Sequence, residues 1–135
     1  MVNILDAEKK KTVLIVEDEP EIRGLYARKM TESGYIVLNA QDGEEGLALA
    51  LEKRPDILLL DYMLPKMNGL DMLKKLRAHN DWGAHVPTIM LTNISPNNAM
   101  YKDIVETTPT YYLIKSNSSP EDIAVKIRER LAEQG

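Results

Sequence analysis

Five polar residues stand directly after apolar runs in this chain, and their side chains are of the kinds that bind ions. They are Glu17, Asp18, Asp61, Thr92 and Lys115. Three carboxylates gathered in one partly dehydrated site would repel one another strongly. A hard divalent cation relieves that repulsion, and Mg²⁺ suits such a site because it takes oxygen ligands and keeps several waters. The pattern therefore indicates a magnesium site, provided that the fold brings these residues together.

Asp61 is the residue on which this interpretation depends. It closes the run I-L-L-L-D, Ile57–Asp61, which lies between Pro55 and Pro65 and is typical of a strand buried on both faces. Considered alone, an aspartate after a strand is more often a turn residue. A buried unpaired charge is costly, so Asp61 is expected at the open edge of a sheet or beside a cation. The polar residues that end the other runs favour a shared site over a turn.

Five short apolar runs alternate with segments of helical periodicity. The predicted strands are Thr12–Val16, Tyr35–Ala40, Ile57–Asp61, Thr88–Leu91 (which leads into Thr92) and Tyr111–Ile114. Capping residues or prolines at the first helical position indicate helix starts at Glu19-Pro20, Asp42, Asn68-Gly69, Ser95-Pro96 and Ser119-Pro120. The polar segment Ala78–Pro87, with its two histidines, is predicted as a surface loop.

Strands that alternate with helices at this spacing predict an α/β fold, a parallel sheet with helices on both faces. Because crossover connections are right-handed, five such units favour a three-layer, doubly wound five-stranded sheet. The expected strand order is flavodoxin-like, 2-1-3-4-5, with five helices. Sites in such folds form beyond the carboxyl ends of the strands, where the strand order reverses. Here the reversal lies between the first and third strands, so the five polar residues should meet there.

The composition is that of one globular domain. The chain has 135 residues, 44% hydrophobic and 28% charged, with a net charge of −4 and no cysteine. The negative charge argues against a nucleic-acid-binding surface, and the lack of cysteine excludes disulfides and thiolate chemistry. The sequence offers no signal peptide and no apolar run near the roughly 20 residues that cross a bilayer. We expect a cytoplasmic protein, with residues 1–11 as a flexible lead-in and residues 12–133 as a single domain.

Four short motifs follow four of the predicted strands. They are V-E-D-E-P after the first strand, D-Y-M-L-P-K-M-N-G after the third, L-T after the fourth and Y-L-I-K after the fifth. Each motif alone is weak. Together, over about Lys11 to Leu131, the chain closely resembles a two-component response-regulator receiver domain.

The resemblance implies a signalling domain, not an enzyme beyond catalysing its own phosphorylation and dephosphorylation. Asp61 would be the phospho-acceptor, taking a phosphoryl group from a sensor histidine kinase or a phosphotransfer protein. The implied cofactor is Mg²⁺, which Asp18 and Asp61 would bind directly. Glu17 would bind it through water, and the backbone carbonyl of Met63 would complete the protein ligands.

The resemblance also implies a switch. Lys115 would neutralise charge on the phosphoryl oxygens. Thr92 would donate its hydroxyl to the phosphoryl group, and Tyr112 would follow it, changing the surface formed by the fourth helix, fifth strand and fifth helix. The signal would pass to a downstream protein or to an output domain outside this chain, from a monomer or a phosphorylation-dependent dimer. No direct contact with nucleic acid or membrane is expected.

The chain departs from the family's pattern at three places. Ser116 follows Lys115 where the family usually has proline, often after a cis peptide. A non-proline cis bond costs roughly 2.5–4 kcal/mol, so a trans peptide and a differently aimed lysine are both open. Asn93 replaces a small residue and is predicted to crowd the phosphoryl entrance. Thr107-Thr108-Pro109-Thr110 replaces a glycine-alanine turn, which affects the output surface.

Two further positions concern the lifetime of the phosphoryl group. Met63 and Ile94 lie two residues beyond Asp61 and Thr92, and in the family these positions flank the path of the hydrolytic water. Both side chains are apolar here. We therefore hypothesise a longer-lived phosphoryl group than in receivers with polar residues at these positions.

Three other functions fit the residues less well. A phosphohydrolase with an aspartyl nucleophile would carry a second aspartate where Met63 stands. A flavin-binding module would need a Ser/Thr/Gly-rich loop after the first strand, where E-D-E-P would repel a phosphate. A pseudo-receiver, an interaction domain that phosphorylation does not control, is the remaining alternative. The acidic pair with Asp61, Thr92 and Lys115 argues against it.

Overall fold

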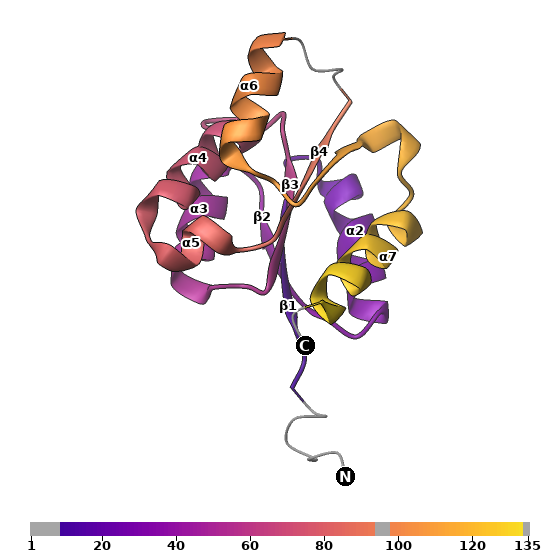
Figure 1. Ribbon diagram of the computed structural model, residues 1–135. Coiled ribbons are helices and arrows are strands. Elements are labelled where there is room, and N and C mark those ends of the chain that lie inside the picture. The colour runs from indigo at the N-terminus through magenta and orange to yellow at the C-terminus, as the bar shows by residue number, and fades with distance from the viewer. Residues whose placement is uncertain (1–8, 94–97, 134–135) are drawn as a thin grey trace.

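The computed structural model describes residues 9–93 and 98–133 (Figure 1). The strands are β1 (Thr12–Val16), β2 (Ile36–Ala40), β3 (Ile57–Asp61), β4 (Thr88–Thr92) and β5 (Tyr111–Ile114). The helices are α2 (Pro20–Glu32), α3 (Gly43–Lys53), α4 (Gly69–His79), α5 (Asp81–His85), α6 (Asn98–Thr107) and α7 (Pro120–Ala132), with the 3₁₀ helix η1 (Lys115–Asn117). The predicted lead-in falls mostly on residues 1–8, and the predicted helix start Ser95-Pro96 on residues 94–97, both outside the described residues. Within the described ranges, no helix has the length and apolar character needed to span a bilayer.

All five strands pair in parallel in the order β2-β1-β3-β4-β5, which confirms the predicted topology. Helices α2 and α7 cover one face of the sheet, and α3, α4, α5 and α6 cover the other (Figure 1). The strand order reverses between β1 and β3, as expected from the alternating pattern. The carboxyl ends of these strands therefore open toward one edge of the sheet.

The three inner strands supply the centre of the core. Every residue of β3 and β4 is buried, and so is β1 after Thr12. Tyr26 and Met30 of α2 pack on one face of the sheet, and Leu73 and Leu76 of α4 pack on the other. Each large apolar side chain buried in this way contributes roughly 1.5–3 kcal/mol. The strands thus form a rigid platform for the loops that follow them.

One prediction of secondary structure is wrong. The segment predicted as a loop, Ala78–Pro87, contains the end of α4 and the whole of α5, so the described residues hold six α-helices rather than five. Asn80 separates the two helices in an extended conformation, and its Oδ1 accepts a hydrogen bond from the Gly83 backbone N at 2.7 Å. That bond caps α5. A five-residue helix is too short to show apolar periodicity in the sequence.

The starts of three longer helices are fixed by side-chain caps at residues that the sequence indicated. Asp42 accepts a hydrogen bond from the Glu45 backbone N at 2.8 Å, and Asn68 starts α4 in the same way. Ser119 and Asp122 form a reciprocal capping box at α7. The caps of α3 and α4 lie at the edge of the sheet where the polar strand ends gather, so they also fix the loops around the site.

Candidate functional site

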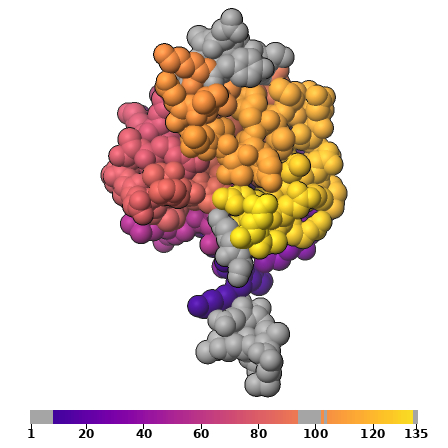
Figure 2. Space-filling view, viewed as in Figure 1, coloured from indigo at the N-terminus to yellow at the C-terminus, as the bar shows by residue number. Residues whose placement is uncertain are grey.

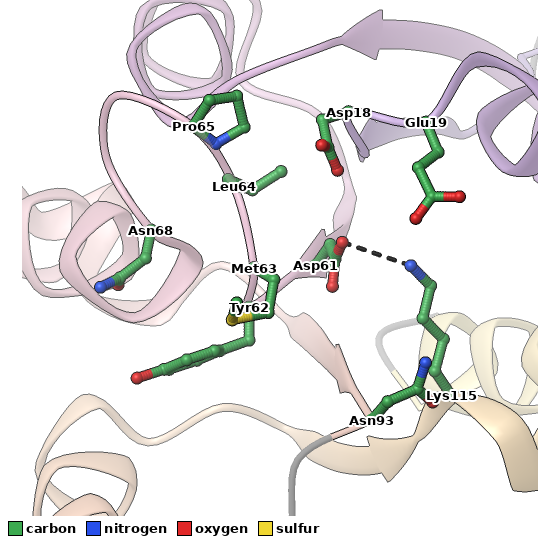
Figure 3. Close-up of a pocket in the computed structure, with 10 residues that line it drawn as sticks. All are labelled: Asp18, Glu19, Asp61, Tyr62, Met63, Leu64, Pro65, Asn68, Asn93 and Lys115. Atoms are coloured by element: carbon green, nitrogen blue, oxygen red, sulfur yellow. Dashed lines mark hydrogen bonds and ion pairs between the residues drawn. The ribbon is translucent and has the colours of Figure 1, made fainter.

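A cleft of about 680 Å³ opens at the carboxyl ends of the strands (Figure 3). Asp18, Asp61 and Lys115 line it, each from the loop or strand end that the sequence indicated. Glu17 and Thr92 are buried at the ends of β1 and β4. The parallel register brings these ends level, since Asp61 pairs with the residue before Thr92 in the neighbouring strand. The fold therefore gathers all five residues at one edge.

Three carboxylates lie together at this edge. Glu17, Asp18 and Asp61 each offer an oxygen within 4.8 Å of the other two. Glu17 is 1% exposed and Asp61 is 5% exposed, whereas Asp18 faces solvent. A set of oxygen ligands with one open, solvent-facing side suits a hard divalent cation that keeps some of its waters. These residues fit Mg²⁺.

Lys115 bridges the two buried carboxylates. Its Nζ lies 2.8 Å from Glu17 Oε2 and 3.3 Å from Asp61 Oδ2, and its side chain is only 10% exposed. Figure 3 shows the lysine reaching across the cleft toward Asp61. One positive charge is thus shared by two buried negative charges, and the exposed carboxylate of Asp18 adds a third. The cluster keeps a net negative charge, which favours binding of a cation.

Burial governs the protonation of the two inner carboxyl groups. It raises the pKa of Glu17 and the pKa of Asp61 above their ordinary values, and the hydrogen bonds and charge of Lys115 offset that rise only in part. Burial lowers the pKa of Lys115, but hydrogen bonds and attraction from Glu17 and Asp61 outweigh it and hold that pKa above its usual range. Lys115 therefore stays charged at neutral pH.

The loop after Asp61 is packed so closely that two glycines are required. A Cβ on Gly69 would overlap the Asp61 backbone oxygen, and a Cβ on Gly43, the first residue of α3, would overlap the Met67 backbone oxygen. The loop of residues 62–68 is therefore held between the start of α4, which follows it in the chain, and the start of α3. This packing fixes the backbone that follows Asp61.

Met63, Thr92 and Tyr112 complete the set of residues singled out from the sequence. Met63 is 57% exposed beside the cleft, and its backbone donates a hydrogen bond to the Asp61 carboxylate. Thr92 is fully buried and pairs with Ile114 in the β4–β5 ladder. Tyr112 is half-buried on β5 and packs in the cluster on the α6 side of the sheet. Tyr112 thus lies away from the cleft, on the strand that leads into Lys115.

Asn93 makes a contact that the sequence analysis did not predict. Its Oδ1 accepts a hydrogen bond from the Ser116 backbone N at 2.9 Å, and the asparagine also lines the cleft beside Lys115 (Figure 3). The Lys115–Ser116 peptide is trans, since the described residues hold no cis peptide. Lys115 reaches both carboxylates in this geometry. Crowding of the phosphoryl entrance by Asn93 stays a prediction.

Two residues of α2 next to the cluster were also missed. Arg23 Nη1 donates a hydrogen bond to the Glu17 backbone oxygen at 2.8 Å. Tyr26 is buried close enough to the cluster to interact with its charges, and burial raises the pKa of its hydroxyl. The two residues are three apart, on one face of the helix. In the sequence that spacing indicates only a helix packed on the core.

A family profile for the response regulator receiver domain matches residues 13–128. The chain belongs to this family. The matched range contains all the site residues described above, from Glu17 to Lys115. Receiver domains of response regulators are signalling domains.

The receiver domain is similar to parts of several curated proteins. It is 32% identical over 123 residues to the probable transcriptional regulator ycf27 of Porphyridium aerugineum, covering 91% of this chain and 49% of that protein. It is 42% identical over 82 residues to the alkaline phosphatase synthesis transcriptional regulatory protein PhoP of Bacillus subtilis, covering 61% of this chain and 33% of that protein. The chain thus spans a third to a half of the length of these relatives.

Solved structures agree with the fold of the receiver domain. A CheY-like response regulator receiver domain protein from Methanospirillum hungatei has a TM-score of 0.84 at 28% identity, covering 93% of this chain and 97% of that one. The chemotaxis response regulator CheY4 of Vibrio cholerae has a TM-score of 0.78 at 29% identity, covering 90% and 98%. These likenesses extend over nearly the whole of each chain, so the fold is that of the CheY-like receivers.

Proposed function

We propose that Asp61 accepts a phosphoryl group from a sensor histidine kinase or a phosphotransfer protein, with Mg²⁺ as the cofactor. The observation that carries the proposal is the cluster of Glu17, Asp18 and Asp61 within 4.8 Å, with Lys115 Nζ 3.3 Å from Asp61. The unit that performs this function is the domain of residues 12–133. The pattern of one exposed and two buried carboxylates, which lie at the ends of β1 and β3, supports a binding site rather than a turn.

Asp61 is the nucleophile of the transfer. A carboxylate oxygen of Asp61 attacks phosphorus, and the bond from phosphorus to the donor's histidine nitrogen breaks, with its electron pair returning to the imidazole. The product is an acyl phosphate on Asp61. Because Asp61 lines a cleft that opens to solvent, a phosphohistidine carried by a separate protein can reach it.

The neighbouring residues hold the cation and balance charge. Asp18 and Asp61 would hold Mg²⁺ directly, Glu17 would hold it through water, and the backbone carbonyl of Met63 would complete the protein ligands. When bound, Mg²⁺ supplies positive charge to the phosphoryl oxygens, which is the main requirement of such transfers. Lys115, which Glu17 and Asp61 share in this structure, turns its ammonium to the phosphoryl oxygens.

Thr92 and Tyr112 carry the signal from the site to the surface. Thr92 moves its hydroxyl to a phosphoryl oxygen, and Tyr112 follows into the space that this movement leaves. Tyr112 packs in the same cluster as Ile104 of α6. Its movement therefore alters the face formed by α6, β5 and α7, which is continuous in the view of Figure 2 (orange to yellow). That face signals to a downstream protein or to an attached output domain, in a monomer or a phosphorylation-dependent dimer in the cytoplasm.

Chemical labelling tests the acceptor. Incubation with acetyl phosphate and Mg²⁺ should add one phosphoryl group per chain, seen by intact mass, and hydroxylamine should remove it because it cleaves acyl phosphates. Asp61→Asn should abolish the labelling, because an amide is a far weaker nucleophile than a carboxylate. Asp71→Asn, at an exposed position in the first turn of α4, is the matched control and should label normally.

Two results would contradict the proposal. Labelling of the Asp61→Asn chain would identify another acceptor. A natural chain that never labels, from acetyl phosphate or from a phosphorylated donor protein, would favour the pseudo-receiver function instead.

A further inference from the structure

The residue after Lys115 donates its backbone N–H to a side chain from another loop. Ser116 N lies 2.9 Å from Asn93 Oδ1. Ser116 is the second residue of η1, and the first N–H groups of a helix have no partner within it. The residue before η1, Ile114, supplies no side-chain cap. Asn93 therefore caps η1 from the end of the neighbouring strand.

This bond extends the pairing of β4 with β5 past its last ladder pair. Thr92 pairs with Ile114, so Asn93 stands level with Lys115 and its side chain reaches one residue further. Figure 3 shows Asn93 beside the backbone of the lysine. The bond joins the two segments that carry Thr92 and Lys115, the hydroxyl and the cation proposed to contact the phosphoryl group.

We propose that Asn93 is a positioning residue for Lys115. By holding the N–H of Ser116, it fixes the direction in which the chain leaves β5, and so keeps Lys115 Nζ within 3.3 Å of Asp61. The inference rests on the proposed function, since it assigns the Asn93–Ser116 bond a role in phosphoryl transfer to Asp61. The bond lies at an exposed position. Water can replace the lost partner, so its removal should loosen the lysine more than it destabilises the fold.

A double-mutant cycle tests whether Asn93 positions Lys115 through its hydrogen bond with the Ser116 N–H. Asn93→Ala removes the acceptor, Ser116→Pro removes the donor, and the double variant removes both. Ser116→Ala, which keeps the N–H and loses only the hydroxyl, is the matched control. The readouts are hydrogen exchange of the Ser116 amide in metal-free protein, Mg²⁺ affinity, and the rate constant of labelling by acetyl phosphate at saturating Mg²⁺.

Asn93→Ala should speed exchange of the Ser116 amide by about ten-fold or more, because the amide loses its acceptor. It should slow labelling by roughly three- to ten-fold, the effect of a misplaced charge-stabilising group. Mg²⁺ affinity should stay within about two-fold, because the proposed metal ligands are unchanged. Ser116→Ala should match the natural chain in all three measurements. In the Ser116→Pro background, Asn93→Ala should change the labelling rate by less than about two-fold, because the shared bond is already absent.

An equal loss of rate from Asn93→Ala in both backgrounds would overturn the inference, because Asn93 would then act without the Ser116 N–H. An unchanged labelling rate in Asn93→Ala would overturn it as well. A natural chain that does not label at Asp61 would instead overturn the proposed function and the catalytic part of this inference. The exchange rate of the Ser116 amide would still show in that case whether Asn93 holds the junction of β5 with η1.

Discussion

At the scale of single residues, the site holds more negative than positive charge. Lys115 contacts two carboxylates, and its Nζ lies nearer to Glu17, at 2.8 Å, than to Asp61, at 3.3 Å. Removing two carboxylates from water costs free energy, and their attraction to a single shared lysine offsets only part of that cost. Without a metal, the two buried carboxylates therefore remain incompletely neutralised, and a bound divalent cation would stabilise them. The ion pair with Glu17 keeps the ammonium group of Lys115 beside Asp61.

The lifetime of the phosphoryl group is a second property of single residues. Met63→Asn together with Ile94→Glu should speed phosphate loss by about ten-fold or more, because polar side chains can orient the attacking water or accept its proton. Met63 is 57% exposed beside the cleft, and Ile94 lies outside the described residues. The measurement is the decay of labelled chain after the donor is removed. Met63→Leu with Ile94→Leu is the apolar control, and equal decay in both pairs would reject the hypothesis.

At the scale of elements, the start of α3 depends on one carboxylate. Asp42 accepts a hydrogen bond from the Glu45 backbone N at 2.8 Å and lies 3.5 Å from Lys66 Nζ. The hydrogen bond from the Glu45 backbone holds the pKa of Asp42 below its ordinary value; burial opposes this lowering, and the nearby charge of Lys66 adds to it. Lys66 belongs to the loop after Asp61, so this cap also ties α3 to the site.

Two substitutions of Asp42 should separate the contribution of its capping hydrogen bond to stability from the contribution of its charge. Asp42→Ala should lower the free energy of unfolding by about 1 kcal/mol at pH 7, the usual loss for an N-cap. Asp42→Asn keeps an acceptor and should lose less. Because the pKa of Asp42 is lower in the folded state, its charge stabilises the fold fully above the unfolded pKa of about 3.9, and this stabilisation is lost as the pH falls through the folded value. Urea unfolding should therefore show the stabilities of the natural chain and Asp42→Asn converging as the pH falls below the unfolded pKa of about 3.9; a constant difference would contradict the charge contribution.

A second element-scale device is the guanidinium of Arg77 in α4. Its Nε donates to the Thr107 carbonyl at 3.0 Å and its Nη2 to the Thr108 carbonyl at 3.1 Å, at the end of α6. Its Nη1 donates to the carbonyls of Gly83 and Val86, at 3.0 and 2.7 Å. One side chain thus joins α4 to α5, to Val86 directly after α5 and to the end of α6.

Loss of this guanidinium should be costly. Arg77→Ala should lower the free energy of unfolding by about 3 kcal/mol, because several partly buried carbonyls lose charged donors. Arg77→Lys should recover only part of that, since an ammonium cannot reach all four carbonyls as the planar fork does. Lys75→Ala, at an exposed position on the same helix, is the control and should stay within about 0.5 kcal/mol of the natural chain. Urea unfolding gives the comparison, and an Arg77→Ala chain as stable as the control would reject the role of Arg77 in joining these elements.

At the scale of the whole molecule, Mg²⁺ binding should stabilise the fold, because the ligand set exists only when β1 and β3 are side by side. A ligand at 100 times its Kd adds about 2.7 kcal/mol. The melting temperature of the natural chain should therefore rise with Mg²⁺. Asp18→Asn should melt close to the natural chain without the metal, because Asp18 is exposed, and should gain far less when Mg²⁺ is added. An equal gain in both chains would show that Asp18 is not a ligand.

The topology and the gathering of five polar residues could be predicted because both follow from local pattern. Parallel strands align their carboxyl ends, so polar residues such as Asp61 and Thr92 that end separate strands must lie at one edge. The contact of Lys115 with Glu17, and that of Asn93 with Ser116, could not be predicted in this way. They depend on how far individual side chains reach between loops. Helix α5 was not predicted because five residues are too few to show the apolar periodicity of a helix.

At Gly43, as at Gly69, the surrounding backbone leaves no room for any other amino acid. The α-carbon of Gly43 faces the Met67 backbone oxygen with no space for even a methyl group. A larger residue there would displace main chain rather than a flexible side chain, and the displaced stretch would be the loop of residues 62–68, which includes Met63. A position with almost no freedom to vary therefore has no side chain and no charge, and it does not line the cleft.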